Sequence, residues 1–297
     1  TMNTALHTAI SILPIMGLIA VVALAFAYLL SRQQVAKLIR PINELDLEEP
    51  LENEVYEELT PLLESIDKQN KEKEAIANMR KEFSANVSHE LKTPLTSISG
   101  YAEIMKSGIV KPEDMPRFSE KIYNEARRLI TLVEDIIKLS HLDEGKVELE
   151  KEDIDLYELT REIISRLAPQ ASAKKVHMEL TGESVIYNGV RQILDEMVYN
   201  ICENAIKYNK EGGEIRVWVG NTLNGKKIIV TDTGIGIPKN QQERIFERFY
   251  RVDKSHSKEI GGTGLGLSIV KHGAILHNAK IHVDSELGKG TRMELTF

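Results

Sequence analysis

The chain has 297 residues, of which 42% are hydrophobic and 28% charged, and its formal net charge is -7. This composition is that of a globular protein with room for more than one domain, and the acidic balance argues against direct nucleic-acid binding. The single cysteine, Cys202, excludes a disulfide framework and a cysteine zinc site. We expect Cys202 to pack inside a helix. Because the first residue is Thr1 and not methionine, we also expect an upstream segment to be missing.

Residues 9–30 form an almost unbroken apolar run that contains no charged residue. At ~1.5 Å per residue, a helix of about 22 residues covers roughly 33 Å, which is enough to cross a bilayer. A signal peptide would need a positive front end and a shorter apolar core, and no Lys or Arg precedes Ala9. A buried helix of a soluble core is the other alternative. Arg32, Lys37 and Arg40 follow the run, so the sequence predicts a membrane-embedded helix whose C-terminal side faces the cytoplasm.

Residues 31–70 are predicted to be a linker with an acidic stretch between residues 44 and 58. A solvated surface is favoured over an ion site for such a charge run. From Thr60 the apolar pattern becomes helical, and one unbroken helix is predicted through Ile76 and Met79 to an end near Ser107 and Gly108.

The central part of this helix has one apolar face. Its members are Phe83, Val87, Leu91, Leu95 and Ile98, continuing at Ala102 and Met105. His89 lies about 160° around the axis from Val87 and Leu91, so it should point into water. Pro94 removes one backbone hydrogen bond and should bend or loosen the helix. A zinc-protease helix would need a second histidine where Thr93 stands, so that interpretation is excluded.

A second amphipathic helix follows a turn at residues 111–114. Its apolar face comprises Phe118, Ile122, Ala126, Leu129, Val133 and Ile136. One hairpin of two such helices cannot bury both apolar faces, so we expect two chains to pair into a four-helix bundle as a homodimer. Residues 141–155 form a polar connector and a plausible domain boundary.

The rest of the chain has mixed patterns. Helices are predicted over residues 157–167, 191–208, 243–249 and 267–276, and strands over 176–180, 215–219, 227–231, 280–283 and 291–297. This order predicts an α+β two-layer sandwich, in which helices cover one face of a mixed, mostly antiparallel sheet.

Three polar or glycine-rich segments of this part favour a nucleotide site. Asn200 and Asn204 share a helix face, although polar surface is the usual explanation of one such pair. Asp232 begins an Asp-Thr-Gly-Ile-Gly-Ile-Pro segment, where a carboxylate can accept from an exocyclic amine and glycines admit a ligand close to the backbone. The glycines of 261–266 precede a helix N-terminus, which favours phosphate binding. Their spacing fits neither the dinucleotide fingerprint nor the lysine loop of P-loop ATPases.

Residues 88–95, Ser-His-Glu-Leu-Lys-Thr-Pro-Leu, resemble the phosphoacceptor box of HisKA-type sensor histidine kinases. Four further segments resemble the remaining boxes of that family in the expected order: Asn200–Asn204 the N box, Asp232–Gly236 the G1 box, Phe246–Phe249 the F box and Gly262–Gly266 the G2 box, with Gly288–Thr291 similar to the last glycine turn. The resemblance covers about residues 71–297. Departures at Tyr199, Ile201, Cys202 and Asn209 are expected not to touch the chemistry.

The residue patterns and the resemblance together predict four regions. They are a transmembrane helix at 9–30, a degenerate HAMP-like linker at 31–70, a dimerisation and phosphotransfer domain at 71–145, and a Bergerat-type GHKL ATP-binding domain at 150–297. The resemblance also implies a location in the bacterial inner membrane, with the catalytic part in the cytoplasm.

The resemblance further implies ATP and Mg²⁺ as cofactors. Asp232 would hold the adenine amine, Gly236 would admit the base, and Tyr208 would stack near it. Asn204, with Asn200, would hold Mg²⁺. The phosphates would meet Lys207, Arg251, Gly264 and Gly266, and the other expected contacts are Gly234, Gly262, Leu265 and Thr291. Residues 238–262, including His256, Ser257 and Lys258, would form a mobile lid.

By the same resemblance, His89 would attack the γ-phosphate, Glu90 would accept from its Nδ1–H, and Thr93 would orient a water for phosphatase activity. The phosphoryl group would pass to an aspartate of a response regulator. Two rivals stay open: another ATPase of the same nucleotide fold, as in the chaperone, gyrase and mismatch-repair families, and a pseudokinase that docks without catalysis.

Overall fold

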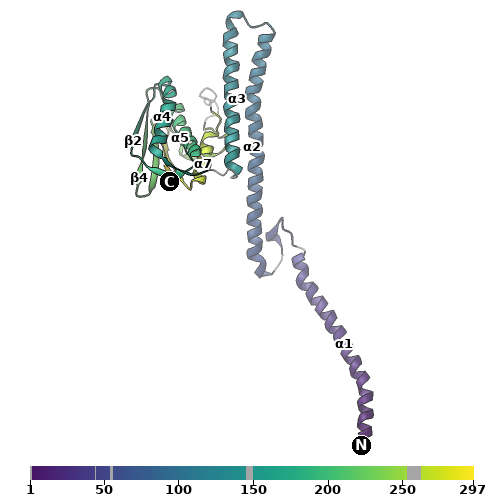
Figure 1. Ribbon diagram of the computed structural model, residues 1–297. Coiled ribbons are helices and arrows are strands. Elements are labelled where there is room, and N and C mark those ends of the chain that lie inside the picture. Colours follow the sequence, from purple (N-terminus) through teal and green to yellow (C-terminus); the bar gives the residue numbers. More distant parts are fainter. Residues whose placement is uncertain (1, 44, 54–55, 145–149, 253–261) are drawn as a thin grey trace. The chain divides into compact units, whose positions relative to one another are not determined.

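The computed structural model describes the chain except for residues 1, 44, 54–55, 145–149 and 253–261 (Figure 1). Two compact units are distinguished, residues 1–82 and residues 83–297, and the division falls within helix α2 (Thr60–Lys106). The predicted unbroken helix from Thr60 is therefore confirmed. It runs through Pro94 and ends before Gly108, whose φ of 73° terminates it.

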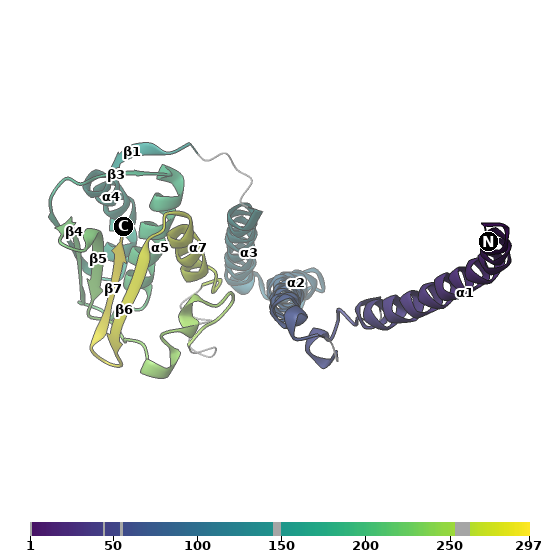
Figure 2. The same cartoon turned by 90° about the horizontal axis from the view of Figure 1, so that it is seen from below.

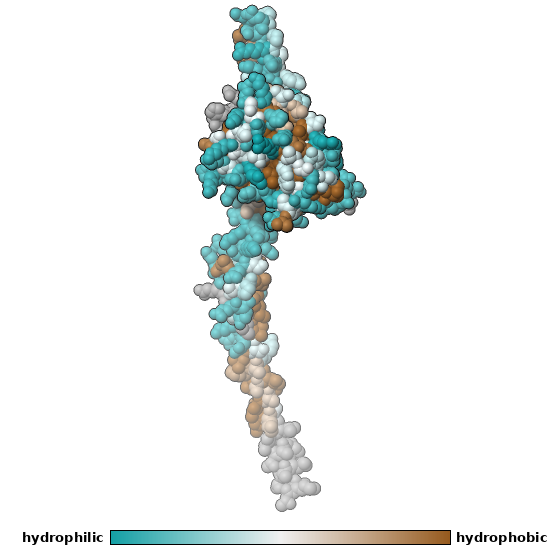
Figure 3. Space-filling model, turned by 90° about the vertical axis from the view of Figure 1, so that its left-hand side faces the viewer, coloured by the Kyte–Doolittle hydropathy of each residue, from teal (hydrophilic) through white to brown (hydrophobic). Residues whose placement is uncertain are grey.

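The first unit begins with helix α1 (Met2–Asn43), which extends beyond the predicted span into the expected linker. Within it, Pro14–Lys37 has a mean hydropathy of 2.2 and exposes its apolar side chains, as the brown stretch of Figure 3 shows. By length and composition this segment could cross a membrane. The acidic stretch after α1 turns around Asn53, whose Oδ1 accepts from the Asp46 N–H at 2.8 Å and whose Nδ2 donates to the Asp46 carbonyl at 2.7 Å.

The second unit begins within α2, whose part from Phe83 onward forms a hairpin with α3 (Met115–Glu144) through a short 3-10 turn at Pro112–Asp114. The Tyr101 and Phe118 rings meet edge to face at 5.8 Å. The predicted apolar faces are only partly covered: Val87 and Leu91 are half-buried, whereas Leu95 is 59% exposed.

The α/β part contains seven strands among the described residues. They are β1 (Glu152–Asp155), β2 (His177–Gly182), β3 (Ile186–Gly189), β4 (Glu214–Thr222), β5 (Gly225–Asp232), β6 (Lys280–Glu286) and β7 (Gly290–Thr296). The main sheet has the order β2-β4-β5-β7-β6, in which only β2 and β4 pair in parallel. The predicted mixed, mostly antiparallel sheet is confirmed.

Helices α4 (Leu156–Ala173), α5 (Arg191–Lys207) and α7 (Gly266–Leu276) lie together on one face of this sheet (Figure 2). Strand β4 turns Ile215, Val217 and Val219 towards them, because alternate side chains of a strand share a face. Cys202 is fully buried in α5, as expected. This packing fixes α5 and α7, which carry most of the candidate site.

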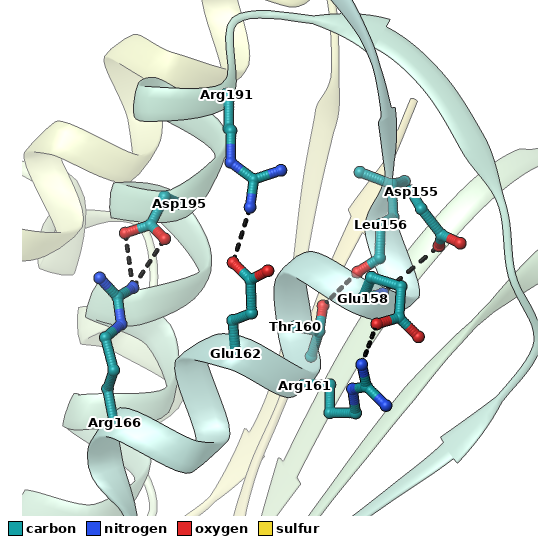
Figure 4. Close-up of polar contacts among 9 residues, drawn as sticks. All are labelled: Asp155, Leu156, Glu158, Thr160, Arg161, Glu162, Arg166, Arg191 and Asp195. Carbon is teal, nitrogen blue, oxygen red and sulfur yellow. Dashed lines mark hydrogen bonds and ion pairs between the residues drawn. The ribbon is translucent and has the colours of Figure 1, made fainter.

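Helix α4 is anchored at its start and along its side (Figure 4). The Asp155 carboxylate accepts from the Tyr157 and Glu158 backbone N–H groups, which caps the helix. Arg166 donates to both carboxylate oxygens of Asp195 on α5, at 2.6 and 2.7 Å. The contact holds α4 beside α5 with a charge-assisted geometry.

One expectation about local structure was wrong, and two short strands were not predicted. The helix predicted over 243–249 is only a 3-10 turn at Arg244–Phe246, because Phe249 takes a φ of 62° and its N–H donates to the Gly264 carbonyl at 2.9 Å. Strands β1 and β3 were missed; each has four residues, and they pair only with one another.

Candidate active site

Helix α5 presents one polar face to a cleft while its opposite face is buried in the core. Asn200 Nδ2 donates to the Glu196 carbonyl at 2.8 Å, which orients its Oδ1 away from its own helix backbone. Lys207 Nζ pairs with Glu203 at 2.8 Å. Asn204 is half-buried, and its amide has no hydrogen bond to any described residue. A half-buried amide in a cleft is available to a ligand or a cation.

Asp232, the last residue of β5, is held by one of its two carboxylate oxygens. Oδ1 accepts from the Gly234 N–H at 2.8 Å and from the Thr291 N–H at 3.2 Å, while Oδ2 has no partner among the described residues. Burial raises the pKa of this carboxyl, and the two N–H bonds oppose that rise. The geometry therefore leaves one oriented acceptor facing the cleft.

Two glycines allow close approaches that a side chain would prevent. Gly236 has a φ of 70°, and a Cβ there would lie 2.0 Å from the Glu286 carbonyl oxygen. A Cβ on Gly266, the first residue of α7, would lie 2.5 Å from Asn200 Oδ1. The start of α7 can therefore sit directly against the polar face of α5.

The N-terminus of α7 carries no side-chain cap, so the backbone N–H groups of its first turn are open to an anion. The side chain of Leu265, which precedes it, is fully buried against Leu132, Leu139 and Ile269. The expected cofactor contact at Leu265 is thus not a side-chain contact.

The candidate residues gather around a cleft of about 1930 Å³. Eleven of the expected cofactor residues line it: Asn200, Asn204, Lys207, Tyr208, Asp232, Gly236, Arg251, Gly262, Gly264, Gly266 and Thr291. Gly234 and Leu265 do not. Part of the expected lid, including His256, Ser257 and Lys258, lies outside the described residues.

Arg251 connects the cleft with the hairpin. Burial lowers its pKa, and the nearby Tyr208 and Glu90 oppose that shift, whereas Arg128 adds to it. Because Tyr208 lines the cleft and Glu90 belongs to α2, the Arg251 guanidinium lies within electrostatic range of both.

His89 lies on the solvent-facing side of α2, and its side chain is 79% exposed, as predicted. Glu90 Oε1 is 3.9 Å from His89 Nδ1, which is too long for the expected hydrogen bond, and Glu90 Oε2 is 3.7 Å from Arg128. The Thr93 hydroxyl donates to the His89 carbonyl at 3.1 Å. His89, Glu90 and Thr93 are not among the cleft-lining residues.

Sequence reasoning missed the contacts that join the hairpin to the α/β part. The Thr263 hydroxyl donates to Asp135 Oδ2 at 2.7 Å, and burial raises the pKa of that carboxyl. Lys138 on α3 pairs with Glu196 on α5 at 3.4 Å. Both acidic residues also line the cleft. No periodic signal marks them, because each pairs with a partner far away in sequence.

No group of three or more His, Cys, Asp or Glu side chains suited to a metal occurs in the described part of the chain. Mg²⁺ does not need such a group, because it prefers oxygen ligands and is commonly held together with substrate phosphates. The amide oxygens of Asn200 and Asn204, in a cleft that also presents an open helix N-terminus, fit that mode of binding.

Comparison with known families agrees with this geometry. Residues 79–145 match the His Kinase A phospho-acceptor domain, and residues 189–297 match the histidine kinase-, DNA gyrase B- and HSP90-like ATPase. The hairpin and the cleft thus define a phosphoacceptor domain followed by an ATPase-type domain. The chain belongs to the two-component sensor histidine kinases.

Individual relatives cover different shares of the chain. The sensor protein kinase WalK of Staphylococcus haemolyticus is 36% identical over 76% of this chain, and the sensor-like histidine kinase SenX3 of Mycolicibacterium smegmatis is 38% identical over 73%. The matched parts span 38% and 57% of those relatives. The structure of histidine kinase ThkA in complex with response regulator protein TrrA, 24% identical, shares the fold with a TM-score of 0.60; the match covers 77% of this chain and 64% of the ThkA chain.

Proposed function

We propose that this chain is an ATP-dependent protein-histidine kinase that phosphorylates His89 and passes the phosphoryl group to an aspartate of a response regulator. The observation that carries the proposal is the combination of an exposed histidine on α2 with a cleft whose open groups match a nucleotide. These are an oriented carboxylate oxygen at Asp232, two amides on α5 and an uncapped α7 N-terminus.

ATP supplies the phosphoryl group, and Mg²⁺ supplies positive charge that neutralises the phosphates. Asp232 Oδ2 accepts from the adenine amine, and the N-terminus of α7 holds phosphate oxygens. Asn204 and Asn200 provide amide oxygens to the cation, and Lys207 and Arg251 face the phosphate charge. His89 attacks the γ-phosphate of ATP through a ring nitrogen, and ADP is the leaving group. At 3.9 Å, Glu90 orients the ring only after a small side-chain rotation.

Four further assignments complete the proposal. A response regulator fits the accessibility of His89, and the ThkA structure contains such a partner. A homodimer fits the apolar side chains left outside on the hairpin, such as Leu95, Ile130 and Ile137, which are 51–59% exposed. The apolar part of α1 fits an inner-membrane location with the catalytic part in the cytoplasm. The exposed Thr93 hydroxyl supports phosphatase activity towards the regulator.

Incubation with γ-labelled ATP and Mg²⁺ tests the kinase. The native chain should acquire label that is lost in acid and survives alkali, and His89→Gln should acquire none. Label in His89→Gln would contradict the proposal. ATP hydrolysis without labelled protein would favour a different ATPase of the same fold, and ATP binding with neither result would favour a pseudokinase.

Dimerisation is tested by sedimentation. A fragment of residues 71–297 should sediment as a dimer at micromolar concentration, and residues 150–297 should be monomeric. A monomeric longer fragment would refute the pairing of hairpins.

A further inference from the structure

The residue after the capping position of α5, Asn209, is one of the few buried polar residues described, with 5% exposure. Its side-chain amide acts both as a hydrogen-bond donor and as an acceptor. Nδ2 donates to the Glu214 carbonyl at 3.2 Å, and Oδ1 accepts from the Lys210 N–H at 3.0 Å and from the Thr233 hydroxyl at 3.3 Å. A carboxylate would lack the donor, and a hydroxyl carries donor and acceptor on one atom, so an amide suits this position.

Thr233, the residue next to Asp232, is fixed on a second side by the first residue of β4. The Glu214 N–H donates to Thr233 Oγ1 at 2.9 Å, and the Thr233 N–H donates to the Glu214 carbonyl at 3.1 Å. The network is tightly packed, because a Cβ on Gly213 would lie 2.1 Å from Asn209 Oδ1. Thr233 therefore has little freedom to move while Asn209 is in place.

The same loop is also tied to the end of α5 by its backbone. The Ile235 N–H donates to the Tyr208 carbonyl at 3.1 Å. The Asn209–Thr233 contact and this bond together set the separation between Tyr208 and Asp232, which line the same cleft. Asp232 in turn is oriented through the Gly234 N–H, two residues along the loop.

We propose that Asn209 is a positioning residue for purine recognition: through Thr233 it holds the Asp232 carboxylate where it accepts from the exocyclic amine of ATP. The proposal rests on the ATP-binding function proposed above and deepens it. It also changes the status of Asn209, a departure from the family that was expected to leave the chemistry untouched.

The test compares ATP with purine riboside triphosphate, which has hydrogen in place of the amine, by calorimetry on the full chain in detergent. A hydrogen bond to a charged acceptor predicts that the native chain prefers ATP by roughly tenfold to a hundredfold. Asp232→Ala should abolish this preference. Asn209→Ala should lower it by about fivefold or more, while the affinity for the amine-free nucleotide stays within about twofold of native.

Thr233→Val is a second test of the Asn209–Thr233 contact, because it removes the hydroxyl with almost no change in side-chain shape. It should lower the preference for ATP as Asn209→Ala does, and the double variant should lose little more of that preference, since each single change already breaks the Asn209–Thr233 contact. Thr160→Val is the control: Thr160 is fully buried, whereas Thr233 is half-buried, and the Thr160 hydroxyl donates to the Leu156 carbonyl on α4. It should lower the melting temperature and leave the preference unchanged.

Equal loss of affinity for both nucleotides in Asn209→Ala and in Thr233→Val would overturn the inference and leave Asn209 a purely structural residue. Failure of the proposed function is recognised separately, because the native chain itself would then bind neither nucleotide or show no preference between them.

Discussion

Replacement of Gly266 by alanine tests whether the start of α7 and the polar face of α5 form one binding surface. The added Cβ would lie 2.5 Å from Asn200 Oδ1. A contact below 3.0 Å requires a shift, and Asn200 cannot swing away at no cost, because its Nδ2 is bonded to the Glu196 carbonyl at 2.8 Å. Either Asn200 loses that bond or the first turn of α7 moves outward.

Two opposing effects determine how far Gly266→Ala changes the free energy of unfolding. Overpacking of this kind costs about 1–3 kcal/mol, whereas alanine in place of glycine in a helix gains up to about 1 kcal/mol. We therefore expect the free energy of unfolding to fall by about 1 kcal/mol. The affinity for ATP with Mg²⁺ should fall roughly tenfold or more, because both groups that move belong to the proposed site and 1.4 kcal/mol corresponds to about a factor of ten.

Gly100→Ala is the matched control. Gly100 also lies in a helix, and a Cβ there would meet no atom within 4 Å. This variant should be as stable as the native chain or slightly more stable, with unchanged ATP affinity. Calorimetric titration with ATP and Mg²⁺, with thermal unfolding of both variants, measures the two effects. Native affinity in Gly266→Ala would refute the assignment of Asn200 and the α7 N-terminus to one ligand.

Three more outcomes are expected. Asn204→Ala should abolish Mg²⁺-dependent ATP binding in calorimetry while the melting temperature stays near native, because its amide bonds no described residue. Thr93→Ala should keep labelling of His89 but lose most dephosphorylation of a phosphorylated regulator; equal loss of both would indicate a distorted helix. Burial holds the pKa of His277 below its ordinary 6.5, so its contribution to stability is present above pH 6.5 and is lost as the pH falls through the folded-state pKa. Relative to His277→Gln, the native chain should lose unfolding free energy in that range; parallel curves would contradict this.

Much of the fold could be predicted because its signals are local. Strand β4 alternates buried and exposed residues, and α5 buries one face only, so period and composition sufficed for both. The segment around Phe249 could not be predicted in this way. Its left-handed backbone follows from a hydrogen bond to Gly264, a partner that only the folded chain supplies. Strands β1 and β3 were not predicted for a related reason, since each is short and forms only by pairing with the other.

The residues of the candidate site also fall into a group that the sequence could predict and a group that it could not. Glycines and amides that meet a ligand carry a spacing signal, because backbone approach and helix periodicity restrict which residues fit, and Gly266 against Asn200 shows that restriction directly. Residues that position the ligand-binding side chains have no recognisable spacing in the sequence. Asn209 and Thr233 are 24 positions apart and meet only because α5 and β5 end beside each other. The residues that position Asp232 therefore follow from the fold and not from the motif, so substitutions outside the recognisable boxes are expected to alter nucleotide selectivity.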